Sequence, residues 1–272
     1  MNQKRIDHEI VLQRIKKHDF LYFLNCAKQF KSIDADSIYK AYCEGNSNLP
    51  PLYERWEKSV ENNAFDFSVY DDDAYLNEAF YCWKKYARTY ILLLKKYVYS
   101  KSCEMNVDDV QSVIDLGCGC GYSTVALKSV FNNAKIVGTN LKNTLQYKID
   151  EEICRQFEDC SMIDESDTLN LGRVDVVFAS EFFEHLQSPK ELLSALIGVY
   201  QPKYFIIANT FTKMSLGHFN SYIWDEDEMS GKEVSRKFND YLRASGYVDL
   251  DTGFFNHRPK IWKKVGTEDA LF

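Results

Sequence analysis

The stretch "VIDLGCGCGYST", residues 113–124, constrains the fold more than any other part of this 272-residue sequence. An apolar run ends there, and glycines follow at three alternate positions, Gly117, Gly119 and Gly121. Glycine adopts positive φ angles readily and lets a ligand approach the backbone closely. The stretch therefore predicts a strand, a tight turn that binds a ligand, and a helix that begins near Ser123.

The sequence beyond residue 105 alternates between strand-like and helix-like segments. Apolar runs predict strands at 112–116, 135–139, 173–179, 204–208, 247–252 and 260–265. Helical patterns between most of these strands cover 123–131, 144–157, 189–199 and 232–245. Such alternation is typical of an α/β fold, a mostly parallel sheet with helices on both faces. Ligands bind at the carboxyl ends of the strands in such sheets.

The first 105 residues have a different pattern, in which apolar residues recur at spacings of three and four. This spacing predicts helices at 6–30, 36–44 and 73–100, with a break at "NSNLPP", residues 46–51. We therefore predict two parts: a helical substrate or cap region, 1–105, and an α/β domain, 106–272.

Composition argues against several classes of protein. The longest apolar run, Tyr90–Leu94, is far shorter than a bilayer span of roughly 20 residues. The N-terminus has no apolar segment typical of a secretory signal. The eight cysteines form no CxxC pair and no Cys/His spacing suited to zinc. We expect no membrane segment, no metal and a cytoplasmic protein with reduced thiols.

Charge makes nucleic acid a disfavoured partner without excluding it. The net charge is −7, and the excess of acidic residues lies mainly beyond residue 105. Affinity for nucleic acid comes mostly from Lys and Arg at phosphates, so an acidic domain binds it poorly. Basic clusters at 84–88 and 257–264 leave a local nucleic-acid site open, although such clusters are also common on solvated helix faces.

Two segments together resemble the class I S-adenosylmethionine-dependent methyltransferases. Residues 113–124 match the first motif of that family, and "DVVFASEFFEHL", 175–186, is similar to the strand-4 segment of its small-molecule branch. A dinucleotide site would need G-x-G-x-x-G, and this chain has Tyr122 at the last glycine. The resemblance covers 106–272. It implies a Rossmann-like sheet of seven strands, the last antiparallel, with S-adenosylmethionine as cofactor.

The resemblance also implies which residues contact the cofactor. They lie in the first motif and at the ends of the next three strands: Asp115, Gly117, Cys118, Gly119, Gly121, Asn140, Asp164, Ser180 and Glu181. The family usually has an acid where this chain has Asn140, and its two oxygens hold both ribose hydroxyls. An amide lacks the charge that strengthens such bonds. Asp164 is equally consistent with the capping of a turn.

Methyl transfer from a sulfonium requires mainly that the reactants be held together in the correct orientation. A weakly acidic acceptor also needs a general base. The candidate catalytic residues are His185, Glu181 and His218. His185 is also consistent with a packed structural histidine, and His218 with a surface residue.

Three functions are compatible with these residues. The first, which we favour, is methyl transfer to a small-molecule acceptor such as a metabolite, nucleotide or sugar. The second is methyl transfer to nucleic acid or protein through the basic clusters. The third is a non-catalytic protein that binds S-adenosylmethionine. We expect the N-terminal helices, which are rich in Tyr and Trp, to complete the acceptor pocket. Tyr70 and Tyr75, which flank three aspartates, are candidates there.

Overall fold

The computed structural model describes residues 17–45, 49–211 and 215–266. Its centre is a seven-stranded sheet in the order β3-β2-β1-β4-β5-β9-β8. The strands are β1 (Ser112–Leu116), β2 (Lys135–Asn140), β3 (Cys160–Asp164), β4 (Val176–Ser180), β5 (Tyr204–Ala208), β8 (Tyr247–Asp249) and β9 (Lys260–Lys264). Strands β1 to β5 are parallel, and β9 is antiparallel to β5. This confirms the predicted α/β fold and its reversed strand.

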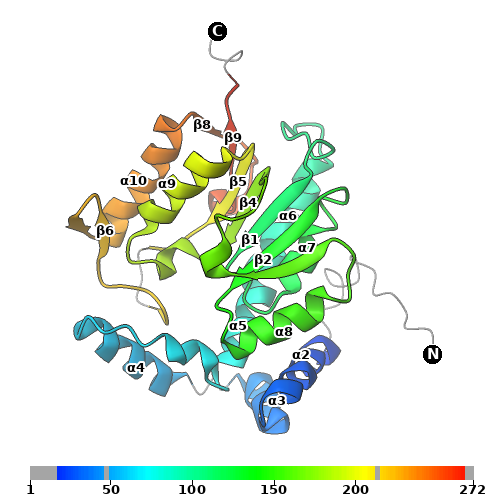
Figure 1. Cartoon of the computed structure of the whole chain (residues 1–272), viewed down its shortest axis with the longest axis vertical. Helices are drawn as coiled ribbons and strands as arrows, with labels where there is room; N and C mark the ends of the chain where they lie inside the picture. Colours follow the sequence, from blue (N-terminus) through cyan, green and yellow to red (C-terminus); the bar gives the residue numbers. More distant parts are fainter. Residues whose placement is uncertain (1–16, 46–48, 212–214, 267–272) are drawn as a thin grey trace.

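Helices cover both faces of the sheet (Figure 1). One face carries α6 (Arg88–Val98), α7 (Tyr122–Leu127) and α8 (Leu145–Cys154), and the other carries α9 (Pro189–Tyr200) and α10 (Gly231–Ala244). Successive side chains of a strand point to opposite faces. In β1, Val113 packs into the core beneath α6 to α8, whereas Ile114 packs into the core beneath α9 and α10.

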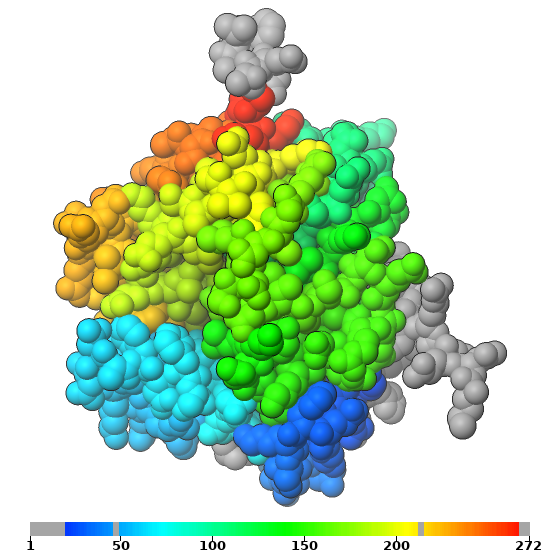
Figure 2. Space-filling model, viewed as in Figure 1, coloured from blue at the N-terminus to red at the C-terminus, as the bar shows by residue number. Residues whose placement is uncertain are grey.

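The remaining N-terminal helices gather at the end of the sheet where the parallel strands finish (Figure 1). They are α2 (Lys17–Phe30), α3 (Ala35–Glu44), α4 (Pro50–Glu61) and α5 (Tyr75–Cys82). Figure 2 shows that these blue to cyan helices form one continuous surface with the α/β part. The Trp56 indole of α4 donates a hydrogen bond of 2.6 Å to the His218 carbonyl, which fixes α4 to the loop after β5.

The N-terminal helices differ in several details from the prediction. The segment 73–100 is α5, a π-helical turn η2 (Trp83–Ala87) and then α6. Single π-helical turns are frequent at functional sites. Helix α4 was not predicted, because its two prolines indicate a break, although proline is also favoured at the first turn of a helix. The beginning of the predicted helix 6–30 lies outside the described residues.

Smaller differences occur in the α/β part. Strand β4 begins three residues later than predicted, and a short hairpin, β6 (Tyr222–Trp224) with β7 (Asp227–Met229), was not predicted. The segment after β4 contains a 3₁₀ turn, η4 (Phe183–His185), and α9 begins at Pro189, where the predicted helix 189–199 also begins. Within the described residues, no helix combines the length and the apolar character needed to cross a membrane.

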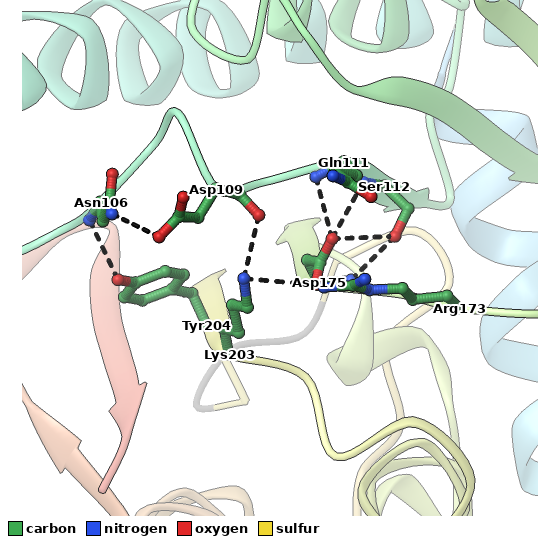
Figure 3. Close-up of polar contacts among 8 residues, drawn as sticks. All are labelled: Asn106, Asp109, Gln111, Ser112, Arg173, Asp175, Lys203 and Tyr204. Carbon is green, nitrogen blue, oxygen red and sulfur yellow. Dashed lines mark hydrogen bonds and ion pairs between the residues drawn. The ribbon is translucent and has the colours of Figure 1, made fainter. Parts of the chain in front are cut away.

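Asp175 ties together the amino ends of neighbouring strands (Figure 3). Its carboxylate accepts hydrogen bonds from the backbone N–H groups of Gln111 (2.9 Å) and Ser112 (3.2 Å) and from the Arg173 guanidinium (2.6 Å). The Lys203 ammonium lies 3.8 Å away. Burial raises the pKa of Asp175, but these hydrogen bonds and charges outweigh burial, so its pKa is lowered overall. This network therefore fixes the edge of the sheet opposite the carboxyl ends.

Candidate active site

A cavity of about 320 Å³ lies at the carboxyl ends of the parallel strands. The end of β1 and the turn after it contribute four predicted residues, Asp115, Gly117, Cys118 and Gly119. The end of β4 and the segments after β4 and β5 contribute four more, Ser180, Glu181, His185 and His218. The structure thus brings together most of the predicted site residues, although they come from three separate parts of the sequence.

The three glycines of the turn have different reasons to be glycine, although all have positive φ angles, 59°, 66° and 72°. A Cβ on Gly117 would collide with the Phe182 ring. A Cβ on Gly121 would lie 3.0 Å from the Asp150 Cα. A Cβ on Gly119 meets no atom within 4 Å. Gly119 therefore leaves open space at the cavity, whereas the missing Cβ of Gly117 and of Gly121 permits close packing with Phe182 and Asp150.

Asp115 holds the turn from within. Its Oδ2 accepts hydrogen bonds from the hydroxyls of Ser123 (2.6 Å) and Thr124 (2.8 Å), both in the first turn of α7. Complete burial raises the pKa of Asp115 to about 7, although the two hydroxyls act in the opposite direction. Asp115 thus connects the end of β1 to the helix after the glycines and fixes the conformation between them.

The Asn140 side chain is directed to the glycine turn. Its amide donates hydrogen bonds to Asp150 Oδ2 (2.9 Å) and to the Gly119 carbonyl (3.3 Å), and its Oδ1 accepts the Leu141 N–H (2.9 Å). The Cys118 thiol donates to the same Asp150 oxygen at 3.6 Å. Burial raises the pKa of Asp150 well above its usual value. Asn140 therefore joins the turn to a buried acid in α8.

Three predicted cofactor contacts do not line the cavity: Gly121, Asn140 and Asp164. Asp164 pairs with Asn140 in the register of β2 and β3. Its Oδ1 accepts hydrogen bonds from the backbone N–H and the hydroxyl of Ser166, both 2.9 Å. In this structure Asp164 caps a turn. The sequence allowed this role as well as contact with the cofactor.

Glu181 lies directly after β4 and is held on several sides. Its two carboxylate oxygens accept the Tyr90 hydroxyl (3.0 Å) and the Thr210 hydroxyl (2.9 Å). Arg258 Nη1 lies 3.7 Å from Glu181 Oε1 and donates to the Thr210 hydroxyl at 2.8 Å. The φ angle of Glu181 is 52°, a strained value for a residue with a side chain. Such strain clusters at functional sites.

Two neighbours of Glu181 were not identified from the sequence as site residues. Glu184 is fully buried, and its Oε1 accepts the Thr210 N–H at 2.7 Å. Burial and the negative charge of Glu181 raise the pKa of Glu184 well above its usual value. Arg258 stands in the basic cluster 257–264, where sequence gives no indication that it turns inward. Its location follows only from the path of the chain before β9.

His185 is half-buried and contacts aromatic side chains. Its Nδ1 lies 3.0 Å from the Tyr70 hydroxyl, and its ring is perpendicular to that of His218 at 4.9 Å between centroids. Burial and the charge of His218 lower the pKa of His185 to about 3, while a backbone hydrogen bond at Gly217 acts in the opposite direction. The Tyr70 ring in turn meets that of Tyr75 edge-on at 5.0 Å. His185 is therefore neutral at neutral pH.

Helices α4 and α5 and the turn η2 close the cavity. They contribute Tyr53, Tyr75, Glu78, Cys82, Trp83 and Tyr86 to its lining. Glu78 was not predicted, because acids on an amphipathic helix usually face solvent. A signal was present, since Glu78 is the only charged residue of α5, "YLNEAFYC".

Comparison with known proteins agrees with this geometry. Residues 114–207 match the family model described as a methyltransferase domain. These residues therefore form a methyltransferase domain, and the sheet around them has the fold of the class I S-adenosylmethionine-dependent methyltransferases. The family model spans β1 to β5, and therefore both the glycine turn and the segment after β4. No curated protein matches the chain.

Several solved structures are similar to this one at low sequence identity. An O-methyltransferase family protein from Burkholderia thailandensis is 12% identical, with a TM-score of 0.51, over 85% of this chain and 72% of that one. Mitomycin 7-O-methyltransferase MmcR is 12% identical, with a TM-score of 0.49, over 94% and 75%. The 16S rRNA methylase ArmA is 15% identical, with a TM-score of 0.38, over 78% and 98%. The first of these supports the fold alone, and the acceptor has to be argued from the site.

S-adenosylmethionine is the methyl donor of this family, and the residues of the cavity fit it. The volume of about 320 Å³ is within the range of small-molecule pockets, roughly 300–1,000 Å³. The open space above Gly119 leaves room for a ligand against the backbone. The polar groups of Ser180 and Glu181 lie at the same end of the sheet, where ligands of such folds bind.

Proposed function

We propose that this methyltransferase acts on a small-molecule acceptor that enters between the α/β part and helices α4 and α5. The supporting observation is the charge of the cavity lining. It includes the carboxylates of Glu78 and Glu181, and no Lys or Arg of the described residues is part of it. Phosphate-rich partners are bound mainly by Lys and Arg. An acidic, aromatic cavity of this size suits a neutral or cationic small molecule instead.

The cofactor would be held along the turn after β1 and the end of β4. Gly117, Gly119, Ser180 and Glu181 would contact it directly, and Glu181 supplies a negative charge for its ammonium group. Asp115 and Asn140 act indirectly in this proposal, because their side chains hold the turn. The bound cofactor supplies a methyl group activated by a sulfonium.

The proton of the acceptor passes to His218 in this proposal. A general base should have a pKa near the working pH, and that of His185 is lowered to about 3. His218 also lines the cavity, and its ring lies 4.9 Å from that of His185 between centroids. His185, held by Tyr70, is then a positioning residue for His218.

The two parts of the chain have separate roles in this proposal. Residues 106–272 bind the cofactor, and residues 1–105 form a helical cap that supplies the acceptor side of the cavity. The eight cysteines all lie among the described residues and are unpaired. Free cysteines are typical of a reducing compartment such as the cytoplasm.

The test separates cofactor binding, turnover and acceptor class. Calorimetry measures binding of S-adenosylmethionine and S-adenosylhomocysteine to the full chain. Production of S-adenosylhomocysteine is then followed with the small-molecule fraction and, separately, with the RNA, DNA and protein fractions of a lysate. We expect turnover with the small-molecule fraction only.

Two results would contradict the proposal. Methylation of RNA or DNA, with binding that weakens steeply as salt rises, would indicate a nucleic-acid enzyme. Cofactor binding without turnover in any fraction would favour a non-catalytic protein.

A further inference from the structure

Glu78 is a half-buried carboxylate in the lining of the cavity. Its Oε1 accepts a hydrogen bond of 3.6 Å from the Cys82 thiol, a weak donor. Burial raises the pKa of Glu78, while the thiol and the charge of Lys85 act in the opposite direction. Lys85 itself lies over the rings of Tyr81 and Tyr86, 5.0 Å from each centroid. No Lys or Arg of the described residues forms an ion pair with Glu78.

Glu78 lies between Tyr75 and Trp83 in the helical segment that α5 and η2 form. Towards the far end of this helical segment, the Trp83 ring stacks on Tyr122, which directly follows the glycine turn, at 5.7 Å. At the near end, Tyr75 contacts Tyr70, the tyrosine that binds His185. Glu78 is one helical turn from Tyr75 and lines the same cavity as His185 and His218.

Two tyrosines that line the cavity accompany Glu78. Burial raises the pKa of both Tyr53 and Tyr75, and the nearby negative charge of Glu78 adds to the rise. A hydrogen bond to Ser215 of the loop after β5 lowers the pKa of Tyr53 and acts against burial. The carboxylate and both rings thus line one part of the cavity.

This combination of groups favours a cation. A carboxylate that loses water on burial is destabilised unless an opposite charge compensates it. Aromatic faces attract ammonium groups through the negative face of the ring. An acceptor with a basic amine would supply the missing charge, whereas an acid would meet repulsion.

We propose that Glu78, together with Tyr53 and Tyr75, binds the ammonium group of an acceptor that carries a basic amine. The proposal rests on the proposed function and specifies its substrate class. A protonated amine has no lone pair with which to attack a methyl group. The ammonium is therefore the recognition group, and the methyl group is transferred to another atom of the same acceptor.

The test uses three phenols of similar shape and different charge: tyramine, 4-ethylphenol and 3-(4-hydroxyphenyl)propionate. Calorimetry measures their binding to the full chain saturated with S-adenosylhomocysteine. We expect tyramine to bind about tenfold more tightly than 4-ethylphenol, and the acid to bind more weakly than both. In Glu78→Gln, tyramine should lose this advantage while the affinity for 4-ethylphenol stays the same.

The matched control is Glu57→Gln, which removes the same charge from an exposed position on α4. It should keep the preference for tyramine. Absence of tyramine binding, equal affinity for tyramine and 4-ethylphenol, or a preference that survives in Glu78→Gln would overturn the inference.

A second measurement separates the acceptor from the cofactor. Glu78→Gln should bind S-adenosylmethionine and S-adenosylhomocysteine as the wild type does. Selective loss of S-adenosylmethionine affinity would mean that Glu78 faces the sulfonium of the cofactor, and would overturn the inference. Failure of the wild type to bind either cofactor would instead overturn the proposed function, and the inference with it.

Discussion

Asn140, at the end of β2, donates its side-chain amide to the buried carboxylate of Asp150 in α8, at 2.9 Å. The same amide reaches the Gly119 carbonyl at 3.3 Å. This pair gives a structural reason for the amide where the family usually has an acid. A carboxylate at position 140 would face the carboxylate of Asp150 beneath the turn that faces the cavity.

We therefore expect Asn140→Asp to weaken S-adenosylhomocysteine binding by about tenfold, or roughly 1.4 kcal/mol, because two carboxyl groups side by side in a buried place cannot both ionise. The exchange Asn140→Asp with Asp150→Asn restores one donor and one acceptor and should recover most of the affinity. Calorimetry measures the affinity of the wild type, of Asn140→Asp and of the double variant for S-adenosylhomocysteine. Tighter binding by Asn140→Asp alone would show that residue 140 holds the ribose directly, as the family pattern implies.

Gly119→Val should abolish cofactor binding and leave the fold intact. The new side chain would project into the cavity, and the φ angle of 66° would cost about 1–2 kcal/mol of stability for a non-glycine residue. Gly253→Val is the matched control, since Gly253 has a φ angle of 63°, an equally open Cβ position and no part in the cavity lining. Both variants should lose similar stability in urea, but only the first should lose binding. Retained affinity in folded Gly119→Val would place the cofactor elsewhere.

The sequence was most informative where one local pattern determines the structure. The predicted strands 112–116 and 204–208 match β1 and β5 residue for residue, because each is a short apolar run between turn residues. The glycine turn was equally clear, since positive φ angles at three alternate positions require glycine. These features placed the cavity at the carboxyl ends of the strands.

Contacts between distant segments could not be predicted in this way. The relation of Asn140 to Asp150 depends on how α8 packs against the glycine turn, and nothing local to either residue indicates it. Arg258 turns inward because of the path of the chain before β9. Glu78 resembles an ordinary solvent-facing acid until the tertiary structure places it in the cavity.

Asp175 should contribute to stability in a way that depends on pH. Its pKa is lowered in the folded chain, so the stabilisation is fully present above the unfolded value near 4 and is lost as pH falls through the folded value. Asp175→Asn should lower the free energy of unfolding by about 1–3 kcal/mol at neutral pH, and the difference should shrink below about pH 4. Urea unfolding of both proteins, from neutral pH to below about pH 4, measures this difference in the free energy of unfolding. Exposed Asp108, replaced by Asn, is the control. A constant difference at all pH values would show that the lost charge is not the cause.

His185 should destabilise the folded chain between about pH 6.5 and pH 3, at a higher pH than the effect of Asp175. Its pKa falls from 6.5 to about 3 on folding, because the ring is buried beside His218. Between these values the unfolded chain binds a proton at this ring and the folded chain does not. The folded state therefore loses up to about 1.4 kcal/mol of stability for each unit that the pH drops below 6.5.

The variant His185→Gln tests this effect. Gln cannot titrate, so His185→Gln should remove this loss. Exposed His257→Gln should keep the wild-type pH dependence. Histidine NMR signals provide a direct check, because the His185 ring should remain neutral at pH 5. A ring that titrates near pH 6 would show that His185 is open to solvent and available as a general base.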